Sequence, residues 1–225
     1  MNRIKLFLII IAVALFYYGC DSSGKTIHID QETKDYCLFK QGSYWIYQDS
    51  ATLETDSIVI ETNPYFTSGK GGGTTDAWET YTYSTYVQNN NTNNLYNTII
   101  RPGFDAEFDN QKPIWYYMDE VSSNASQYKY YSFHNGSIGE KYLGGFNSPY
   151  FYSKFELIYQ NYKCNEIVYE NVKMFLLTAE TIPEETLMKL YWAKHIGLVR
   201  IEDYSDTTKV SVKNLIRYNV ENYEN

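Results

Sequence analysis

The sequence is poor in the residues from which enzymes and metal sites are usually built. It contains three histidines, three cysteines and five prolines among 225 residues. No histidine lies at metal-ligand spacing from another histidine or from a cysteine. The chain also lacks the H-E-x-x-H, C-x-x-C and G-x-S-x-G spacings of zinc hydrolases, redox dithiols and serine hydrolases. The residues therefore predict a protein that is not an enzyme and holds no metal or cofactor.

Basic residues are also in short supply. The chain has 19 basic and 27 acidic side chains, which gives a net charge of −8. Nucleic acids are bound mainly through Lys and Arg contacts to phosphate, so a chain this acidic is a poor candidate for that role. The apolar run over residues 6–18 is shorter than the about 20 residues that a membrane-spanning helix needs. We therefore expect no nucleic-acid partner, and a different use for the apolar run.

Residues 1–19 have the layout of a secretory signal peptide. Arg3 and Lys5 precede the apolar run without any acid, and the chain turns polar directly after Gly19 and Cys20. Cleavage before Cys20 would leave 17 basic and 27 acidic residues, a net charge of −10. Residues 20–35 are mostly polar and are expected to form a short tether. The alternative is an uncleaved anchor, or a core helix that carries Cys20 by chance.

The pair Gly19-Cys20 at the end of the apolar run resembles the lipobox of bacterial lipoproteins. The resemblance implies that the Cys20 thiol is acylated, for example with palmitate, and that the lipid is the contact with the membrane. Two or three acyl chains hold a protein firmly, whereas one myristoyl-length chain does not. Tyr17 and Tyr18 depart from the usual Leu-Ala/Ser pair, as in loose lipoboxes of Bacteroidetes-like proteins. The resemblance implies that the protein lies in the cell envelope, at the outer membrane. It leaves open whether the domain faces the periplasm or the outside of the cell.

The most unusual abundance is that of tyrosine, with 25 residues. Tyrosine favours strands and half-buried surfaces. Short aromatic or β-branched segments bounded by turn signals, without helix–strand alternation, predict an antiparallel sheet. We expect an all-β fold in one monomeric domain, residues 36–225, with a strongly curved sheet that forms a sandwich or a partly closed barrel. The predicted strands cover residues 44–47, 57–62, 78–87, 95–100, 114–118, 127–133, 150–159, 166–179, 187–193, 198–204 and 209–220.

Three segments are less regular. The glycine-rich residues 68–73 and the asparagine-rich residues 88–94 are predicted as loops. Residues 181–184, Thr-Ile-Pro-Glu, fit the start of a helix with a capping box and a proline in the first turn. A strand from residue 187 fits better, because Tyr191-Trp192 leads through Gly197 into the next strand, as in a hairpin.

Two segments resemble those of uncharacterised exported lipoproteins of the Bacteroidetes. The first is F-x-x-G-x-x-W-x-Y, which runs from Phe39 to Tyr47 here, and the second is Y-W-A-K-x-I-G-L-V-R, residues 191–200. The resemblance covers the two ends of the domain and implies an all-β envelope domain with no assigned activity. Gly42 and Gly197 are interpreted as turn residues, and Trp45 and Trp192 as core residues.

Two cysteines remain if Cys20 carries lipid. Cys37 and Cys164 would lie in an oxidising compartment, where a disulfide is permitted. Such a bridge would close a long loop and add about 4–5 kcal/mol in the chain-entropy model. The other interpretation is two buried thiols that never meet. The sequence supplies no distance between them, so both remain open.

The function that these observations support is a non-catalytic binding or structural role in the envelope, with an envelope protein or a glycan as partner. One alternative is a glycan-binding lipoprotein, because sugars stack on flat aromatic faces. A second is a carrier that encloses a hydrophobic ligand within a curved sheet. A third is a hydrolase with converging carboxylates, which sequence alone cannot test. The candidate stacking residues are Tyr81, Tyr83, Trp115 and Tyr130. Tyr81 and Tyr83 are two residues apart in the strand predicted over residues 78–87, so they should share one face of it.

Overall fold

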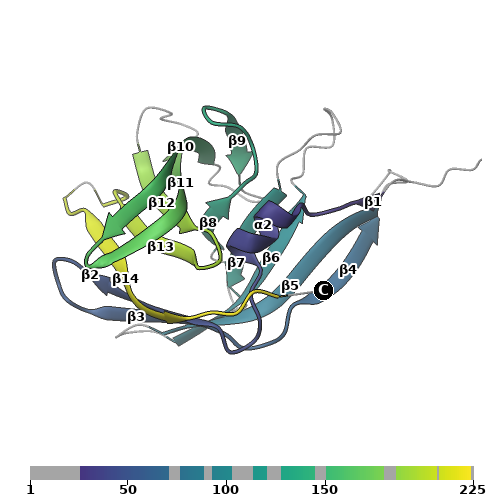
Figure 1. Cartoon of the computed structure of the whole chain (residues 1–225), viewed down its shortest axis with the longest axis horizontal. Helices are drawn as coiled ribbons and strands as arrows, with labels where there is room; N and C mark the ends of the chain where they lie inside the picture. Colours follow the sequence, from purple (N-terminus) through teal and green to yellow (C-terminus); the bar gives the residue numbers. More distant parts are fainter. Residues whose placement is uncertain are drawn as a thin grey trace, which may run out of the picture.

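Antiparallel strands form most of the computed structural model (Figure 1). It describes residues 26–70, 77–88, 93–102, 114–120, 128–144, 151–179, 186–206 and 208–223. The strands are β1 (Thr26–Ile27), β2 (Tyr44–Asp49), β3 (Thr55–Ile60), β4 (Tyr65–Lys70), β5 (Ala77–Gln88), β6 (Asn93–Pro102), β7 (Ile114–Glu120), β8 (Tyr128–Phe133), β9 (Lys141–Gly144), β10 (Phe151–Cys164), β11 (Ile167–Ala179), β12 (Thr186–Ala193), β13 (Gly197–Asp203) and β14 (Ser211–Asn219). The predicted all-β class is confirmed.

The strands form one large, curved sheet that does not close into a barrel. Their order is β8-β7-β6-β5-β3-β2-β14-β13-β12-β11-β10-β9, and β1 and β4 each pair with β5 beside this row. Every pair is antiparallel except the short parallel pair of β1 with β5. Strands β5–β8 and β9–β14 are two meanders. The pairing of β14 with β2 joins the two halves of the sheet.

The inner face of the curved sheet carries the core. In β5, Tyr81 and Tyr83 are buried on the same side, together with Thr85, which is the shared face predicted for the two tyrosines. In the other half, Phe175 of β11 pairs with Leu190 of β12, and both are fully buried. Along β5 buried positions alternate with half-buried ones, as the two-residue side-chain period of a strand requires, whereas β11, β12 and β13 each contain consecutive buried residues.

Helix α2 (Gln31–Cys37) precedes the first long strand and belongs to the domain. Asp30 caps its start, because the Asp30 carboxylate accepts a 2.7 Å hydrogen bond from the backbone N–H of Thr33. The chain leaves the helix at Leu38, which has extended backbone angles. The sequence missed this helix and placed residues 26–35 in the tether. That boundary was wrong, since β1 and α2 bring the start of the folded domain forward to Thr26.

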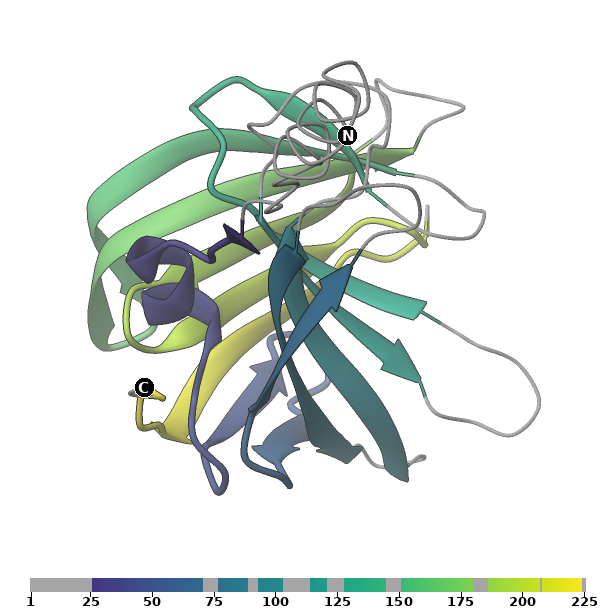
Figure 2. The same cartoon turned by 90° about the vertical axis from the view of Figure 1, so that its right-hand side faces the viewer.

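Helix α2 contacts both halves of the sheet and lies between them (Figure 2). The Tyr36 hydroxyl donates to the carbonyl oxygen of Asn171 in β11 at 2.6 Å. The Tyr83 hydroxyl of β5 donates to the carbonyl oxygen of Cys37 at 3.0 Å. A seven-residue helix is too short to be stable by itself, so these tertiary contacts hold it in place.

The two segments that resemble exported lipoproteins pack directly against each other. The Trp45 indole N–H donates to the carbonyl oxygen of Ile196, and the Tyr47 hydroxyl donates to that of Leu198 at 2.7 Å. The rings of Phe39 and Trp45 meet edge to face, with centroids 5.2 Å apart. Trp45 and Trp192 are buried, as predicted. The segments are about 150 residues apart in sequence, and the β2–β14 pairing places them together.

Besides β1, two more strands lie where the sequence predicted none. Strand β4 includes Ser68, Gly69 and Lys70, so the predicted loop over residues 68–73 was wrong in its first half. Its sequence, Tyr-Phe-Thr-Ser-Gly-Lys, alternates poorly, and pairing with β5 decides its conformation. Strand β9 is four residues long and pairs only with β10. The strand predicted from residue 187 is confirmed as β12, and residues 181–185 lie outside the described residues.

We predict that Gly197→Ala destabilises the fold more than Gly42→Ala does. Both glycines have positive φ, +92° and +86°, so an alanine costs about 1–2 kcal/mol at either position. A Cβ at Gly197 would also lie 3.2 Å from the buried ring of Phe39, whereas a Cβ at Gly42 would meet nothing within 4 Å. Overpacking should add about 1 kcal/mol at Gly197. Urea denaturation of both variants measures the difference, and equal losses would contradict this account of the contact.

Candidate functional site

The residues predicted to stack on a glycan do not form a platform. Tyr81 and Tyr83 are each only 2% exposed and belong to the core, so their assignment as stacking residues was wrong. They were misassigned because alternation along β5 shows which residues share a face, but not which face is buried. Trp115 and Tyr130 lie on β7 and β8, and their side chains are outside the described part of the structure.

The two remaining cysteines are free and buried. Cys37 ends α2, and Cys164 ends β10, where its thiol lies 3.1 Å from the amide oxygen of Asn214. Burial raises the pKa of both thiols. Both are therefore protonated at neutral pH and are poor nucleophiles. Of the two interpretations left open by the sequence, the structure shows separate thiols and no disulfide. Cys20 lies outside the described residues.

A buried lysine lies beneath α2. The Lys173 side chain is 6% exposed, and its ammonium lies 2.9 Å from the carboxylate of Glu32, which is 55% exposed. Three aromatic rings surround the ammonium, with centroids 5.1 to 5.4 Å away, and they belong to Tyr36, Phe133 and Phe155. Cation–π attraction and one carboxylate at the rim therefore replace the water that this charge loses.

We predict that Glu32→Gln destabilises the protein more than Lys173→Met does. The first change leaves a buried ammonium with aromatic rings alone and should cost about 1–2 kcal/mol, less than for a fully buried pair because Glu32 is exposed. The second leaves an exposed carboxylate and an apolar side chain in an aromatic cage, so the loss should be under about 1 kcal/mol. Denaturant melts measure both.

Glu221→Gln is the matched control for this comparison. Glu221 pairs with Lys40, and both side chains are exposed, at 69% and 42%. Exposed ion pairs contribute between about 0 and 1 kcal/mol, so this change should have little effect. A larger loss for Lys173→Met than for Glu32→Gln would show that the ammonium itself stabilises the core.

His134 is a fully buried histidine on the same side of the sheet. Burial lowers its pKa to about 4, the backbone of Ser153 opposes this by hydrogen bonding, and the charge of Lys173 adds to it. Its ring contacts that of Phe175 edge to face, with centroids 4.8 Å apart. The imidazole is therefore neutral at physiological pH and is shielded from any substrate in water.

The lowered pKa of His134 predicts a pH-dependent stability. The unfolded histidine has a pKa of about 6.5, so the unfolded chain takes up the proton first as the pH falls. Stability from the neutral imidazole is complete above pH about 6.5 and is lost toward pH 4. Between pH 7 and 4.5 the loss should be about 2–3 kcal/mol larger for the native protein than for His134→Gln. Parallel slopes in denaturant melts would contradict the burial of this ring.

Glu79 fastens the N-terminal segment to β5. Its side chain is 5% exposed and lies 2.8 Å from the ammonium of Lys34. It also accepts a 2.7 Å hydrogen bond from the backbone N–H of Ile29. Burial by itself raises the pKa of Glu79, but the hydrogen bonds from Lys34 and Ile29 outweigh it and lower the pKa below its ordinary value. The charged carboxylate of Glu79 therefore holds the chain against β5 at Ile29, three residues after Thr26.

The outer face of strands β10–β14 carries the best candidate for a binding surface. Three tyrosine rings group together there, with Tyr162 stacked on Tyr191 at 5.0 Å and Tyr159 5.0 Å from Tyr162. Tyr159 and Tyr162 are half-buried, and Tyr191 lies beneath them. Burial raises the pKa of Tyr162 to about 12, so its hydroxyl stays protonated and able to donate.

Glu202 connects these rings to two cations. Its carboxylate lies 2.7 Å from the guanidinium of Arg200 and 3.7 Å from the ammonium of Lys189. The hydroxyls of Tyr191 and Tyr204 donate to it at 3.2 and 2.7 Å. Burial by itself raises the pKa of Glu202, but the hydrogen bonds from Tyr204 and Arg200 lower it. The network holds aromatic and charged groups in fixed positions, as a recognition surface requires.

The sequence missed this cluster. Tyr191 directly opposes Arg200, and Lys189 directly opposes Glu202. These cross-strand pairs follow from the register of β12 with β13. A shift of the pairing register by one residue would turn these side chains to the opposite face of the sheet. The cluster could therefore be found only once the register was known.

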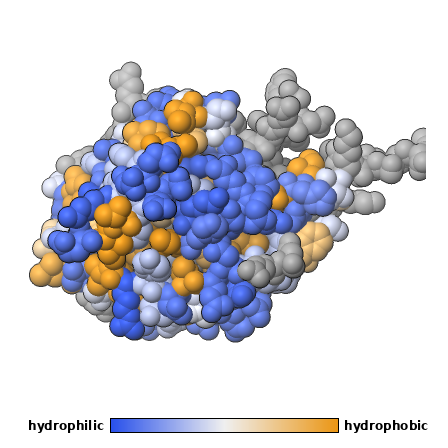
Figure 3. Space-filling model, viewed as in Figure 1, coloured by the Kyte–Doolittle hydropathy of each residue, from blue (hydrophilic) through white to orange (hydrophobic). Residues whose placement is uncertain are grey.

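The described core contains a small void. A void of about 20 Å³ lies where β2, β3 and β5 face β12 and β13, and its walls include Trp45, Tyr83 and Trp192. This is room for about one water molecule, whereas sites for small molecules enclose about 300–1,000 Å³. A lipid in this void would require the core to rearrange. On the face seen in Figure 3, hydrophobic atoms form separate patches among hydrophilic ones.

Two further features bear on function. Within the described part of the chain, no group of three or more His, Cys, Asp or Glu side chains is arranged to hold a metal ion. None of the described helical residues forms a segment long and apolar enough to cross a bilayer.

Comparison of this chain with protein-family models, with curated proteins and with solved structures finds no match. The function must therefore be argued from the residues and their geometry.

Proposed function

We propose that this protein is a cell-envelope lipoprotein, anchored through Cys20, whose domain binds a partner without catalysis. The observation that carries the proposal is the distance along the chain between the lipid and the fold. Thr26, the first residue of β1, follows Cys20 by six residues. Six extended residues span at most about 20 Å. A lipid at Cys20 would therefore hold the domain close to the membrane surface.

The fastening of this segment supports the proposal. Glu79 binds Lys34 and the backbone of Ile29, and Asn135 donates to the carboxylate of Asp30. A force on the lipid anchor would therefore be transmitted through these contacts to β5 and to Asn135 after β8. The segment after Thr26 would not detach as a loose tether does. The domain would keep a defined end toward the membrane.

The state of the reactive groups supports a binding role. His134 is buried and neutral, and the thiols of Cys37 and Cys164 are buried and protonated. General acid–base catalysis needs a group that reaches the substrate and titrates near the working pH. These three groups meet neither condition.

The outer face of β10–β14 favours glycan binding as the second candidate function. Tyr159 and Tyr162 are half-buried rings beside the hydrogen-bonding network of Arg200 and Glu202. Ring faces accept the apolar C–H faces of a sugar, and fixed polar groups orient its hydroxyls. This cluster replaces Tyr81 and Tyr83, which are buried, as the candidate stacking surface.

We predict that Cys20→Ala abolishes labelling with radioactive palmitate and shifts the protein from the membrane pellet to the soluble or secreted fraction. Acyl chains are the contact that holds it, so their loss should release the domain. Ser23→Ala, three residues away, is the matched control and should label and sediment as the native protein does. Retention of Cys20→Ala in the pellet after a carbonate wash would contradict the anchor.

Protease treatment of intact cells, with a tag at Asn225, then shows on which side of the outer membrane the domain lies. Loss of the tag from intact cells would place the domain outside and support capture of an external partner. Protection until the envelope is broken would place it in the periplasm and direct the search to assembly partners.

A further inference from the structure

The outer face of the C-terminal half-sheet carries an unusual row of lysines. The strand registers align Lys141 of β9 with Lys154 of β10, and Lys154 with Leu176 of β11. Leu176 then aligns with Lys189 of β12, and Lys189 with Glu202 of β13. Directly paired residues of an antiparallel sheet point to the same side. Three lysines therefore share one face along a line across five strands.

This face has the opposite charge from the rest of the protein. Among the described side chains, the row and its direct neighbours comprise four cations, Lys141, Lys154, Lys189 and Arg200, and two acids, Glu156 and Glu202. The local excess is two positive charges on a chain whose net charge is −8. Charges beyond about 10 Å are largely screened at 0.1 M salt. A molecule that touches this face therefore meets the local positive charge and little of the distant negative charge.

The pairing at the sheet edge is unfavourable without a bound anion. Lys141 and Lys154 are directly opposite each other across β9 and β10, and like charges in such a pair repel. Glu156, 2.6 Å from Lys154, offsets only one of the two. Lys141 is exposed, so an incoming anionic group can reach it and relieve the repulsion.

The lysine row adjoins the tyrosine cluster. The carboxylate of Glu202 lies 3.7 Å from the ammonium of Lys189 and accepts a hydrogen bond from the Tyr191 hydroxyl of the cluster. The ring of Tyr204, outside the cluster, has its centroid 5.2 Å from the same ammonium. Strands in a sheet are about 4.8 Å apart, so the cations recur at intervals of about 5 to 10 Å beside aromatic rings. This arrangement suits a linear polymer with an anionic group on successive units and apolar ring faces between them.

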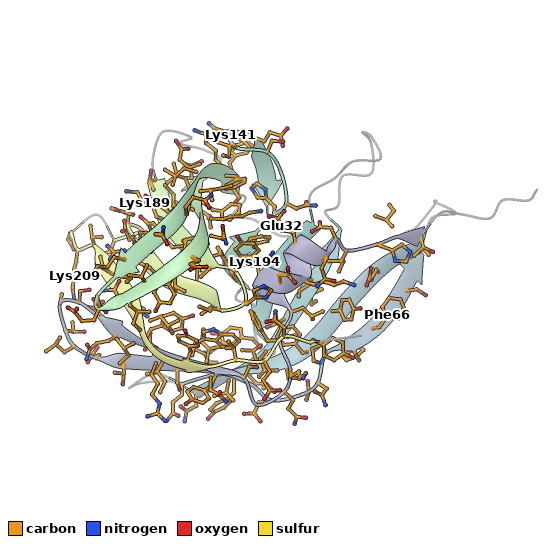
Figure 4. All side chains as sticks on the ribbon, in the orientation of Figure 1. Glu32, Phe66, Lys141, Lys189, Lys194 and Lys209 are labelled. Atoms are coloured by element: carbon orange, nitrogen blue, oxygen red, sulfur yellow. The ribbon has the colours of Figure 1, made fainter. Side chains whose placement is uncertain are left out.

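The location of the row separates it from the anchored end of the domain. Lys141 and Lys189 lie over the half of the molecule formed by β9–β13, whereas β1 lies at the opposite side (Figures 1 and 4). The residues that would lead to a lipid at Cys20 are at the β1 end. The lysine row and β1 therefore lie at different sides of the domain, which disfavours the anchoring bilayer as the ligand of the row.

We infer that this face binds an acidic polysaccharide, with the lysine row contacting its carboxylates and the tyrosine cluster its sugar rings. The inference rests on the proposed binding function and names the chemistry of its ligand. It does not depend on the lipid anchor, because every residue that carries it belongs to β9–β13 or the residues just after β13.

The test measures binding of the mature chain, held in detergent micelles, to polygalacturonate and to its fully methyl-esterified form. The two polymers share a backbone and differ in charge. Polygalacturonate should bind at least about tenfold more tightly at about 0.1 M salt and lose that advantage at about 1 M. The variant K141Q/K154Q/K189Q should lose about tenfold in affinity for polygalacturonate, as the sum of three exposed charge contacts.

Two further variants separate charge from structure. K141R/K154R/K189R keeps the charge and should bind as the native chain does. K40Q removes a lysine outside this face and should also leave binding unchanged. Thermal melts of all variants confirm that each is folded, since the three lysines are exposed or half-exposed.

The remaining outcomes overturn the inference in distinguishable ways. Equal binding to both polymers would reject an acidic ligand and leave the proposed glycan binding standing. Binding only to vesicles of phosphatidylcholine and phosphatidylglycerol would replace the polysaccharide with a membrane surface. Binding to none of these probes would reject the inference, while palmitate labelling of Cys20 would still decide the anchor independently.

Discussion

The structure depends on the contact between the aromatic side chains of β2 and the turn between β12 and β13. Trp45 and Tyr47 donate hydrogen bonds to backbone carbonyls of residues 196 and 198, and Gly197 permits the approach because it has no Cβ. Each indole or hydroxyl satisfies a polar group that would otherwise be buried alone. This contact, together with the β2–β14 pairing, turns two meanders into one curved sheet.

Helix α2 lies between the two halves of the sheet and contacts both of them. It is short, yet Tyr36 contacts β11, Cys37 accepts from β5, and Lys194 of the β12–β13 turn binds Asp35 at 3.1 Å. Lys173 is held beneath the helix by Glu32 and three rings. A buried ion pair contributes little net stability, but separating its two partners costs free energy. The charged contacts thus position the helix, and apolar burial provides the stability.

The inner and outer faces of the C-terminal half-sheet have different roles. The inner face is lined by buried residues such as Phe175 and Leu190, and the described void beside them has about 20 Å³. The outer face combines half-buried tyrosines with cations in a chain that is otherwise acidic. Recognition is therefore most readily accommodated on the surface of the sheet, where side chains are held in place by cross-strand neighbours.

Local pattern alone determined the all-β class, eleven of the strands, the shared face of Tyr81 and Tyr83, and the burial of Trp45 and Trp192, because side-chain period and turn residues act within a few positions. Residue types alone also suggested the signal peptide and the lipid at Cys20, which remain predictions. Tertiary structure decided which face of β5 is buried, that α2 belongs to the domain, that Cys37 and Cys164 stay apart, and that three lysines share a row. These features depend on strand register and on contacts between distant segments, which a single sequence does not specify.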